Sequence, residues 1–84
     1  MVHHLKTWPV YFNPIWDGIK HFEFRKNDRD YKIDDVLVLE EYHPEGQFYT
    51  GRVIKAKVPY ILEGFNHTLD DNVIMSIDII SKQE

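Results

Sequence analysis

Residues 21–26 read His-Phe-Glu-Phe-Arg-Lys and alternate between apolar and polar side chains. Successive side chains of a β-strand point to opposite faces, so Phe22 and Phe24 share one face while Glu23 and Arg25 share the other. This alternation predicts a half-buried strand with one apolar and one charged face. We expect the phenylalanines to face the core, and the charged face is the first candidate for chemistry.

A short helix is expected before this strand. Thr7 offers an N-cap, Pro9 suits a first helical turn, and Gly18 is a natural stop. Between these signals the apolar residues recur at spacings of three and four: Trp8, Tyr11, Phe12, Ile15 and Trp16. Pro14 lies inside the pattern and removes one backbone hydrogen bond, so Asn13 is a candidate cap for a second start.

Other short strands are expected along the rest of the chain. They lie at about residues 3–6, 36–39, 47–50, 54–62 and 73–80, with a turn at 44–46 that makes a hairpin. Pro59 requires an edge or a bulge in the fourth of these strands. Two sets of residues are expected to face inward: Ile54, Ala56, Val58, Tyr60 and Leu62, and then Val73, Met75, Ile77 and Ile79.

These elements predict a mostly β, α+β fold with one or two short helices, arranged as a small, mostly antiparallel β-barrel. A chain of 84 residues holds one core, so residues 1–84 are expected to form a single domain. Hydrophobic residues make up 43% of the chain and aromatic residues 14%, which is enough for such a core.

Composition narrows the function classes. The chain has no cysteine, which excludes disulfides, thiolate nucleophiles and Cys-based zinc sites and fits a reducing compartment. Its five histidines show no ligand spacing, so we expect no metal and no cofactor. No apolar run approaches the roughly 18 residues of a membrane span, and no secretory leader opens the chain. We therefore expect a soluble, cytoplasmic protein without a membrane partner.

The charge is unevenly distributed along the chain. The net charge is −4, but residues 1–33 carry six Lys or Arg against four acids, whereas residues 34–84 carry four against ten. An anionic ligand is therefore expected to bind the first part. The alternative is an ordinary solvated surface of mixed charge.

The charged segment resembles a known family signature. Residues 18–25 follow the pattern Gly-x-Lys-x-x-Glu-x-Arg, and residues 33–37 follow with Ile-Asp-Asp-Val-Leu. The pattern resembles that of the ASCH superfamily, in particular its small single-domain bacterial and phage members, whose barrel is related to the PUA fold of RNA-binding proteins. The resemblance extends to residues 4–6, 11–12, 25–29, 49–52 and 60–62. It implies a ligand cleft between the helix and the barrel, with residues 18–25 on its floor.

The candidate site residues follow from this segment. Lys20 and Arg25 can grip a phosphate, and Glu23 can accept hydrogen bonds from an exocyclic amino group of a base. The alternative is that these three form only a surface salt-bridge ladder. The other candidates are basic or aromatic: Lys26, Arg29, Trp8, Tyr11 and Trp16. Residues 27–30 also have a simple explanation as a turn, and aromatic residues at helical spacing are more often core than a stacking platform.

Three functions fit these residues. The first is an RNA-binding or nucleotide-binding module that uses the cleft. The second is a small amidohydrolase of acetylated cytidine, which the resemblance implies through Lys20 and Glu23. Against it, Glu23 occupies the position of a threonine in those enzymes, and residues 63–71 are too short for their inserted helical segment. The third is an accessory module that binds another protein.

Overall fold

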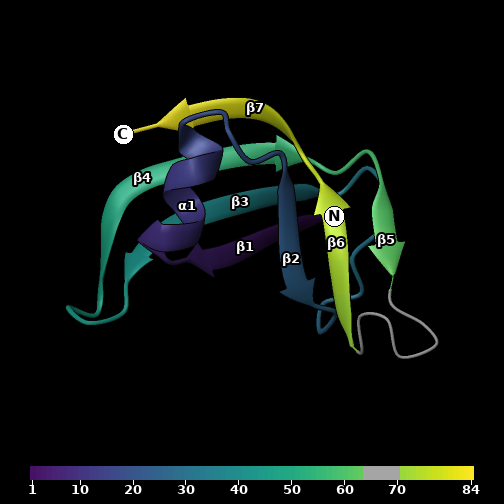
Figure 1. The fold of residues 1–84 in the computed structure, drawn as a ribbon, viewed down its shortest axis with the longest axis horizontal. Helices are drawn as coiled ribbons and strands as arrows, with labels where there is room; N and C mark the ends of the chain where they lie inside the picture. Colours follow the sequence, from purple (N-terminus) through teal and green to yellow (C-terminus); the bar gives the residue numbers. More distant parts are fainter. Residues whose placement is uncertain (64–70) are drawn as a thin grey trace.

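The computed structural model describes residues 1–63 and 71–84, which form one short helix and several strands (Figure 1). In chain order the elements are β1 (Val2–Thr7), α1 (Pro9–Trp16), β2 (Phe22–Lys26), β3 (Val36–His43), β4 (Phe48–Lys57), β5 (Ile61–Glu63), β6 (Asn72–Ser76) and β7 (Asp78–Gln83). The expectation of a mostly β chain with a short helix is confirmed.

The strands form two sheets. The larger has the order β1-β3-β4-β7, and the smaller has the order β2-β6-β5. All pairs are antiparallel except β1 with β3, whose parallel pairing requires the intervening chain, with α1 and β2, to cross from one strand to the other. Both sheets are open within residues 1–63 and 71–84, so the closed barrel expected from the sequence is not confirmed.

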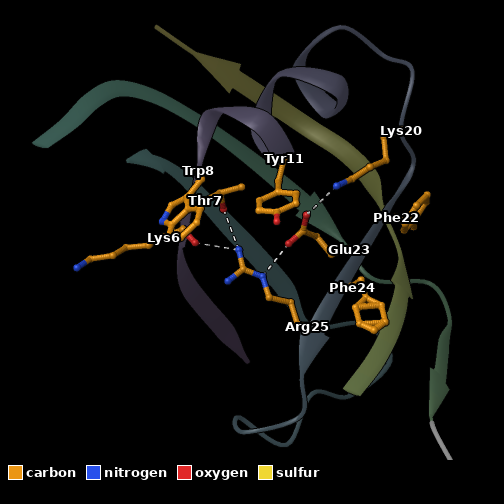
Figure 2. Close-up of a pocket in the computed structure, with 9 residues that line it drawn as sticks. All are labelled: Lys6, Thr7, Trp8, Tyr11, Lys20, Phe22, Glu23, Phe24 and Arg25. Atoms are coloured by element: carbon orange, nitrogen blue, oxygen red, sulfur yellow. Dashed lines mark hydrogen bonds and ion pairs between the residues drawn. The ribbon is translucent and has the colours of Figure 1, made fainter. Parts of the chain in front are cut away.

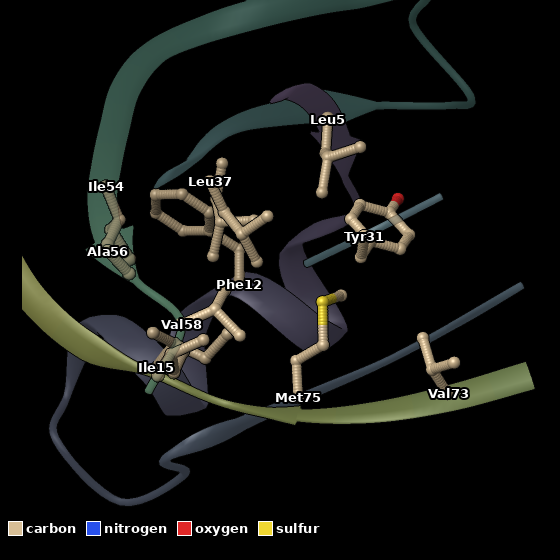
Figure 3. Close-up of a cluster of buried hydrophobic side chains, with 12 residues drawn as sticks. Leu5, Phe12, Ile15, Tyr31, Leu37, Ile54, Ala56, Val58, Val73 and Met75 are labelled. Carbon is tan, nitrogen blue, oxygen red and sulfur yellow. The ribbon is translucent and has the colours of Figure 1, made fainter. Parts of the chain in front are cut away.

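The core lies between α1 and the two sheets (Figure 3). Phe12 and Ile15 from the helix are fully buried and meet side chains from both sheets. The strands contribute Leu5, Leu37, Leu39, Ile54, Ala56, Val73 and Met75 to this cluster, and the connecting segments contribute Tyr31, Val58 and Ile77. Burying these apolar side chains is the main favourable contribution to folding, at about 25 cal/mol per Å².

The helix begins one residue later than expected. Thr7 is the last residue of β1 and is buried, and Trp8 takes the N-cap position without a side-chain cap bond, so the proposed Thr7 cap is wrong. The helix continues through Pro14 without a second start at Asn13, because a proline in the middle removes only one of its hydrogen bonds. Gly18 ends it as expected, with a positive φ of 77° that favours glycine.

The alternation of β2 is confirmed, but the expected faces are reversed. Glu23 is only 3% exposed, whereas Phe22 and Phe24 are 45% and 50% exposed. A period of two fixes which residues share a face but does not determine which face is buried. Here the charged face turns toward β1 and α1, where Arg25 neutralises the buried carboxylate.

The two sets of residues that the sequence predicts to face inward are only partly buried. Val58 is buried but Tyr60 and Leu62 are exposed, because β4 ends before Pro59 and β5 starts with a new alternation at Ile61. In the last segment Val73, Met75 and Ile77 are buried, whereas Ile79 is exposed. Residue 77 lies between β6 and β7, where the chain leaves one sheet for the other and the face changes.

The turn before β3 uses two aspartates for different purposes. Asp34 has a positive φ of 77°, a conformation that glycine adopts more easily. Asp35 is buried, and its carboxylate accepts hydrogen bonds from His3 Nε2 at 2.7 Å, the Lys32 N–H at 2.9 Å and the Met1 amino group at 3.0 Å. Burial alone would raise the pKa of Asp35, but these hydrogen bonds lower it to about 2.

We predict that Asp35→Asn lowers the free energy of unfolding at pH 7 by about 2 kcal/mol, since charge-assisted hydrogen bonds are lost. The folded-state pKa of Asp35 is depressed, so the carboxylate stabilises the fold above pH 4 and this contribution disappears between about pH 4 and pH 2. Urea unfolding of the unmodified protein and of Asp35→Asn between pH 4 and pH 2 should show that the difference in their free energies of unfolding decreases as the pH falls. Asp34→Asn is the matched control, because Asp34 is exposed and asparagine tolerates a positive φ. A difference that stays constant down to pH 2 would contradict the assignment.

Candidate functional site

A pocket of about 620 Å³ lies where the end of β1, the start of α1 and strand β2 meet (Figure 2). The residues that line it are Lys6, Thr7, Trp8, Tyr11, Lys20, Phe22, Glu23, Phe24 and Arg25. Its volume lies in the range of small-molecule sites, and its lining combines aromatic rings with a few charged groups, as such sites do.

A buried carboxylate is the central group of this pocket. Glu23 Oε2 accepts a hydrogen bond from Arg25 Nε at 2.8 Å. Its other oxygen, Oε1, lies 3.9 Å from Lys20 Nζ, which is an ion pair but too long for a hydrogen bond. Among the described residues every fully buried side-chain N or O atom has a hydrogen-bond partner, so Oε1 retains contact with the open pocket. It can therefore accept a hydrogen bond from a ligand.

Arg25 joins β2 to the end of β1. Its Nη2 donates to the backbone carbonyl of Lys6 at 3.0 Å and to Thr7 Oγ1 at 2.9 Å, while Thr7 Oγ1 donates to the carbonyl of Leu5 at 3.2 Å. Three of its hydrogen bonds thus go to different groups and hold the guanidinium in one orientation. Arg25 is therefore a structural partner of Glu23 as well as a positive charge at the pocket.

Lys20 reaches the pocket because the helix ends at Gly18. The carbonyl of Pro14 accepts the backbone N–H groups of Ile19 and Lys20, which directs the chain back from the helix toward β2. The Lys20 ammonium lies 5.5 Å from the centre of the Tyr11 ring and 5.4 Å from that of Phe22. These cation–π distances place its charge near two aromatic rings that both line the pocket.

The aromatic wall of the pocket comes from the first turn of α1. Trp8 and Tyr11 lie with their ring centres 6.4 Å apart and their planes inclined by 28°, and both side chains are about half exposed. Figure 2 shows the two rings beside the Glu23 and Arg25 side chains. Exposed, nearly parallel rings beside a hydrogen-bonding group can hold a planar ligand by stacking.

A second buried ion pair fixes the helix that carries this wall. Arg52 on β4 binds Glu41 on β3 through Nε and Nη2, both at 2.8 Å, and Nη2 also donates to Asn13 on α1. The hydrogen bonds from Arg52 lower the pKa of Glu41, and the same bonds raise the pKa of Arg52. The guanidinium also lies 4.8 Å from the ring centre of Trp16. Arg52 thus attaches α1 to the larger sheet.

The structure brings five of the candidate residues together in the pocket: Trp8, Tyr11, Lys20, Glu23 and Arg25. Lys26 is exposed at the end of β2 and does not line it. Arg29 donates to the carbonyl of His4 and also lies outside the lining. Trp16 stacks on Phe12 with ring centres 5.8 Å apart, so it belongs to the packing of the helix.

Sequence reasoning missed several lining residues, namely Lys6, Thr7, Phe22 and Phe24. The sequence pattern predicts Thr7 as a helix cap and the two phenylalanines as core residues. Thr7 and Lys6 approach β2 through the contacts of Arg25, a tertiary relation that no local pattern encodes.

Residues 1–63 and 71–84 lack two features, a cluster of metal ligands and a membrane-spanning helix. No group of three or more metal-ligating side chains occurs within these ranges. None of their helices has the length and apolar character required to span a membrane.

We predict that Arg25→Met lowers the free energy of unfolding by about 3 kcal/mol, because it leaves the Glu23 carboxylate buried without its main partner. The double variant Glu23→Gln with Arg25→Met should be more stable than Arg25→Met alone, since it removes the unpaired charge. Arg29→Met is the matched control and should cost less than 1 kcal/mol, roughly the value of an exposed contact. Urea denaturation measures the stability of these three variants and of Glu23→Gln. If the loss of stability in the double variant equals the sum of the losses in Glu23→Gln and Arg25→Met, the coupling is contradicted.

Comparisons with known proteins place the chain in a family. Residues 2–77 match the family described as "Domain of unknown function (DUF3850)". The chain is also 35% identical over 74 residues to the "Uncharacterized 12.9 kDa protein in GpA 3'region" of Escherichia phage P2. That alignment covers 88% of this chain and 65% of the phage protein, so the chain spans just under two thirds of that relative. With the pocket residues inside the matched range, the chain belongs to the DUF3850 family.

Proposed function

We propose that the pocket binds the base of a nucleotide or of RNA. The observation that carries this proposal is the Glu23 carboxylate, which is held in place by Arg25 while its Oε1 faces the pocket beside Lys20. A fixed carboxylate oxygen accepts hydrogen bonds well from the exocyclic amino group of cytosine. The aromatic pair Trp8 and Tyr11 supports the proposal, because it offers a face on which a base can stack.

The charges around the pocket suit the rest of a nucleotide. Lys20 and Lys6 both line it, and Lys6 Nζ lies 4.5 Å from the ring centre of Tyr42. Either ammonium group can meet a phosphate at the mouth of the pocket while the base enters beside Glu23. The chain as a whole is acidic, with a net charge of −4, so binding would depend on these local cations.

The proposal also includes a superfamily and a closed-barrel fold for the chain. We assign the chain to the ASCH superfamily with a PUA-like barrel on the basis of the Gly-x-Lys-x-x-Glu-x-Arg pattern of residues 18–25. The position of Lys20, Glu23 and Arg25 at one pocket supports this assignment. An experimental structure of the full chain tests it, with a continuous closed sheet as the expected result.

We predict that the protein binds cytidine 5′-monophosphate about tenfold more tightly than uridine 5′-monophosphate, because uracil presents a carbonyl where cytosine presents an amino group. Glu23→Gln should reduce this ratio to near one, since its amide can donate to the uracil carbonyl. Isothermal titration calorimetry measures both affinities. Asp28→Asn removes an exposed acid outside the pocket and is the charge-matched control. Equal affinity of the unmodified protein for both nucleotides would contradict the role of Glu23.

A hydrolase is the second candidate. The observation that favours it is the position of Lys20 and Glu23, 3.9 Å apart at one pocket, because each is a group that can give or take a proton from a water or substrate bound beside it. In that reaction water would add to the acetyl carbon of N4-acetylcytidine, and the C–N bond would break to give acetate and cytidine.

We predict that the protein binds N4-acetylcytidine weakly and releases no acetate, because Arg25 holds the carboxylate of Glu23 in an ion pair. Chromatography of the incubated nucleoside measures release. Cytidine that forms with the unmodified protein and not with Lys20→Met would replace the binding proposal with the hydrolase.

A further inference from the structure

The outer face of the smaller sheet carries exposed aromatic and aliphatic side chains. Phe22 and Phe24 project from β2 on the side opposite Glu23 and Arg25, as Figure 2 shows, and both also border the pocket. The strand register extends this face across the sheet. Phe24 pairs with Ile74, which pairs with Leu62, while Phe22 pairs with Ser76. Together with Lys26 and Asn72, these outward positions form what we call the β2 outer face.

The β2 outer face lacks acidic side chains, although the chain carries more acids than bases. Among the described residues of its strands, Glu23 points to the pocket, and Glu63 pairs with the buried Val73 on the other face. Lys26 is exposed and forms no ion pair within residues 1–63 and 71–84. A patch of exposed aromatic rings bordered by lysines complements an anionic ligand with planar groups.

Lys20 connects this face with the pocket. Its ammonium lies 5.5 Å from the ring centre of Tyr11 and 5.4 Å from that of Phe22, which borders the pocket and also belongs to the outer face. A phosphate bound at Lys20 would therefore have two aromatic rings near it. In a single-stranded nucleic acid, each phosphate joins two nucleotides whose bases lie on either side of it. Phe22 and Phe24 are about 7 Å apart along the β-strand.

From this arrangement we infer that the ligand is a single-stranded nucleic acid of at least two nucleotides. One base enters the pocket, the next phosphate lies at Lys20, and the following base stacks on the β2 outer face. This inference rests on the proposed function, because it requires the pocket to hold the first base. It adds that affinity increases with each further base that can stack on the β2 outer face.

Two trinucleotides test the inference. One is CpCpC, and the other has the same backbone with a single cytosine and two abasic riboses, so both present the same phosphates. Calorimetry is expected to show that the unmodified protein binds CpCpC at least tenfold more tightly. Phe24→Leu should reduce this ratio toward one. Phe48→Leu is the matched control, because Phe48 is a similarly exposed phenylalanine, at 52%, outside the pocket, and it should leave the ratio unchanged.

The outcomes separate the two proposals. If both trinucleotides bind with equal affinity, the inference fails while the proposed function stands. If neither binds and cytidine 5′-monophosphate does not bind either, the proposed function fails and the inference fails with it. Sedimentation velocity tests whether a second copy of the chain occupies the β2 outer face. If the unmodified protein is a dimer and Phe24→Leu dissociates it, the face is a dimer interface and the inference is overturned.

Discussion

The ion pair between Glu23 and Arg25 is the interaction on which the pocket depends. Removing a carboxylate from water costs several kcal/mol, so Glu23 can lie almost fully buried only if a cation and hydrogen bonds compensate for the lost hydration. Arg25 provides both, and its remaining donors bind the end of β1. One pair of side chains therefore neutralises the site and also fixes the separation of β1 and β2, which form two of the pocket's walls.

Two further buried carboxylates use the same principle at other junctions. Glu41 with Arg52 connects β3, β4 and α1, and Asp35 with His3 connects β1 to the turn before β3. The apolar core supplies most of the stabilisation, but apolar contacts are not directional, so they do not prevent small displacements of the surrounding elements. Directional hydrogen bonds at these positions restrict such displacements, which a site that recognises a ligand by hydrogen bonding requires.

Local patterns located the helix and most of the strands, and within β2 they also predicted which side chains share a face. Gly18 marked the end of the helix, and residues 21–26 marked a strand with Glu23 and Arg25 on one face. The buried side of that strand could not be predicted, because hydrophobicity favoured the phenylalanines. The contacts that hold Arg25 beside the buried Glu23 come from Lys6 and Thr7, which lie 19 and 18 positions from Arg25 in the sequence. The parallel pairing of β1 with β3 was likewise outside the reach of local patterns, and it is what brings Lys6 and Thr7 to the pocket.

Nuclear magnetic resonance of the ¹⁵N-labelled protein during titration with cytidine 5′-monophosphate tests the central claim most directly, because it locates the ligand. The account predicts that the Arg25 Nε–H signal and the backbone amides of Trp8, Tyr11 and Lys20 shift together and saturate with a single affinity. Shifts confined to the β3–β4 hairpin near residues 43–48, or a spectrum unchanged at millimolar nucleotide, would contradict it.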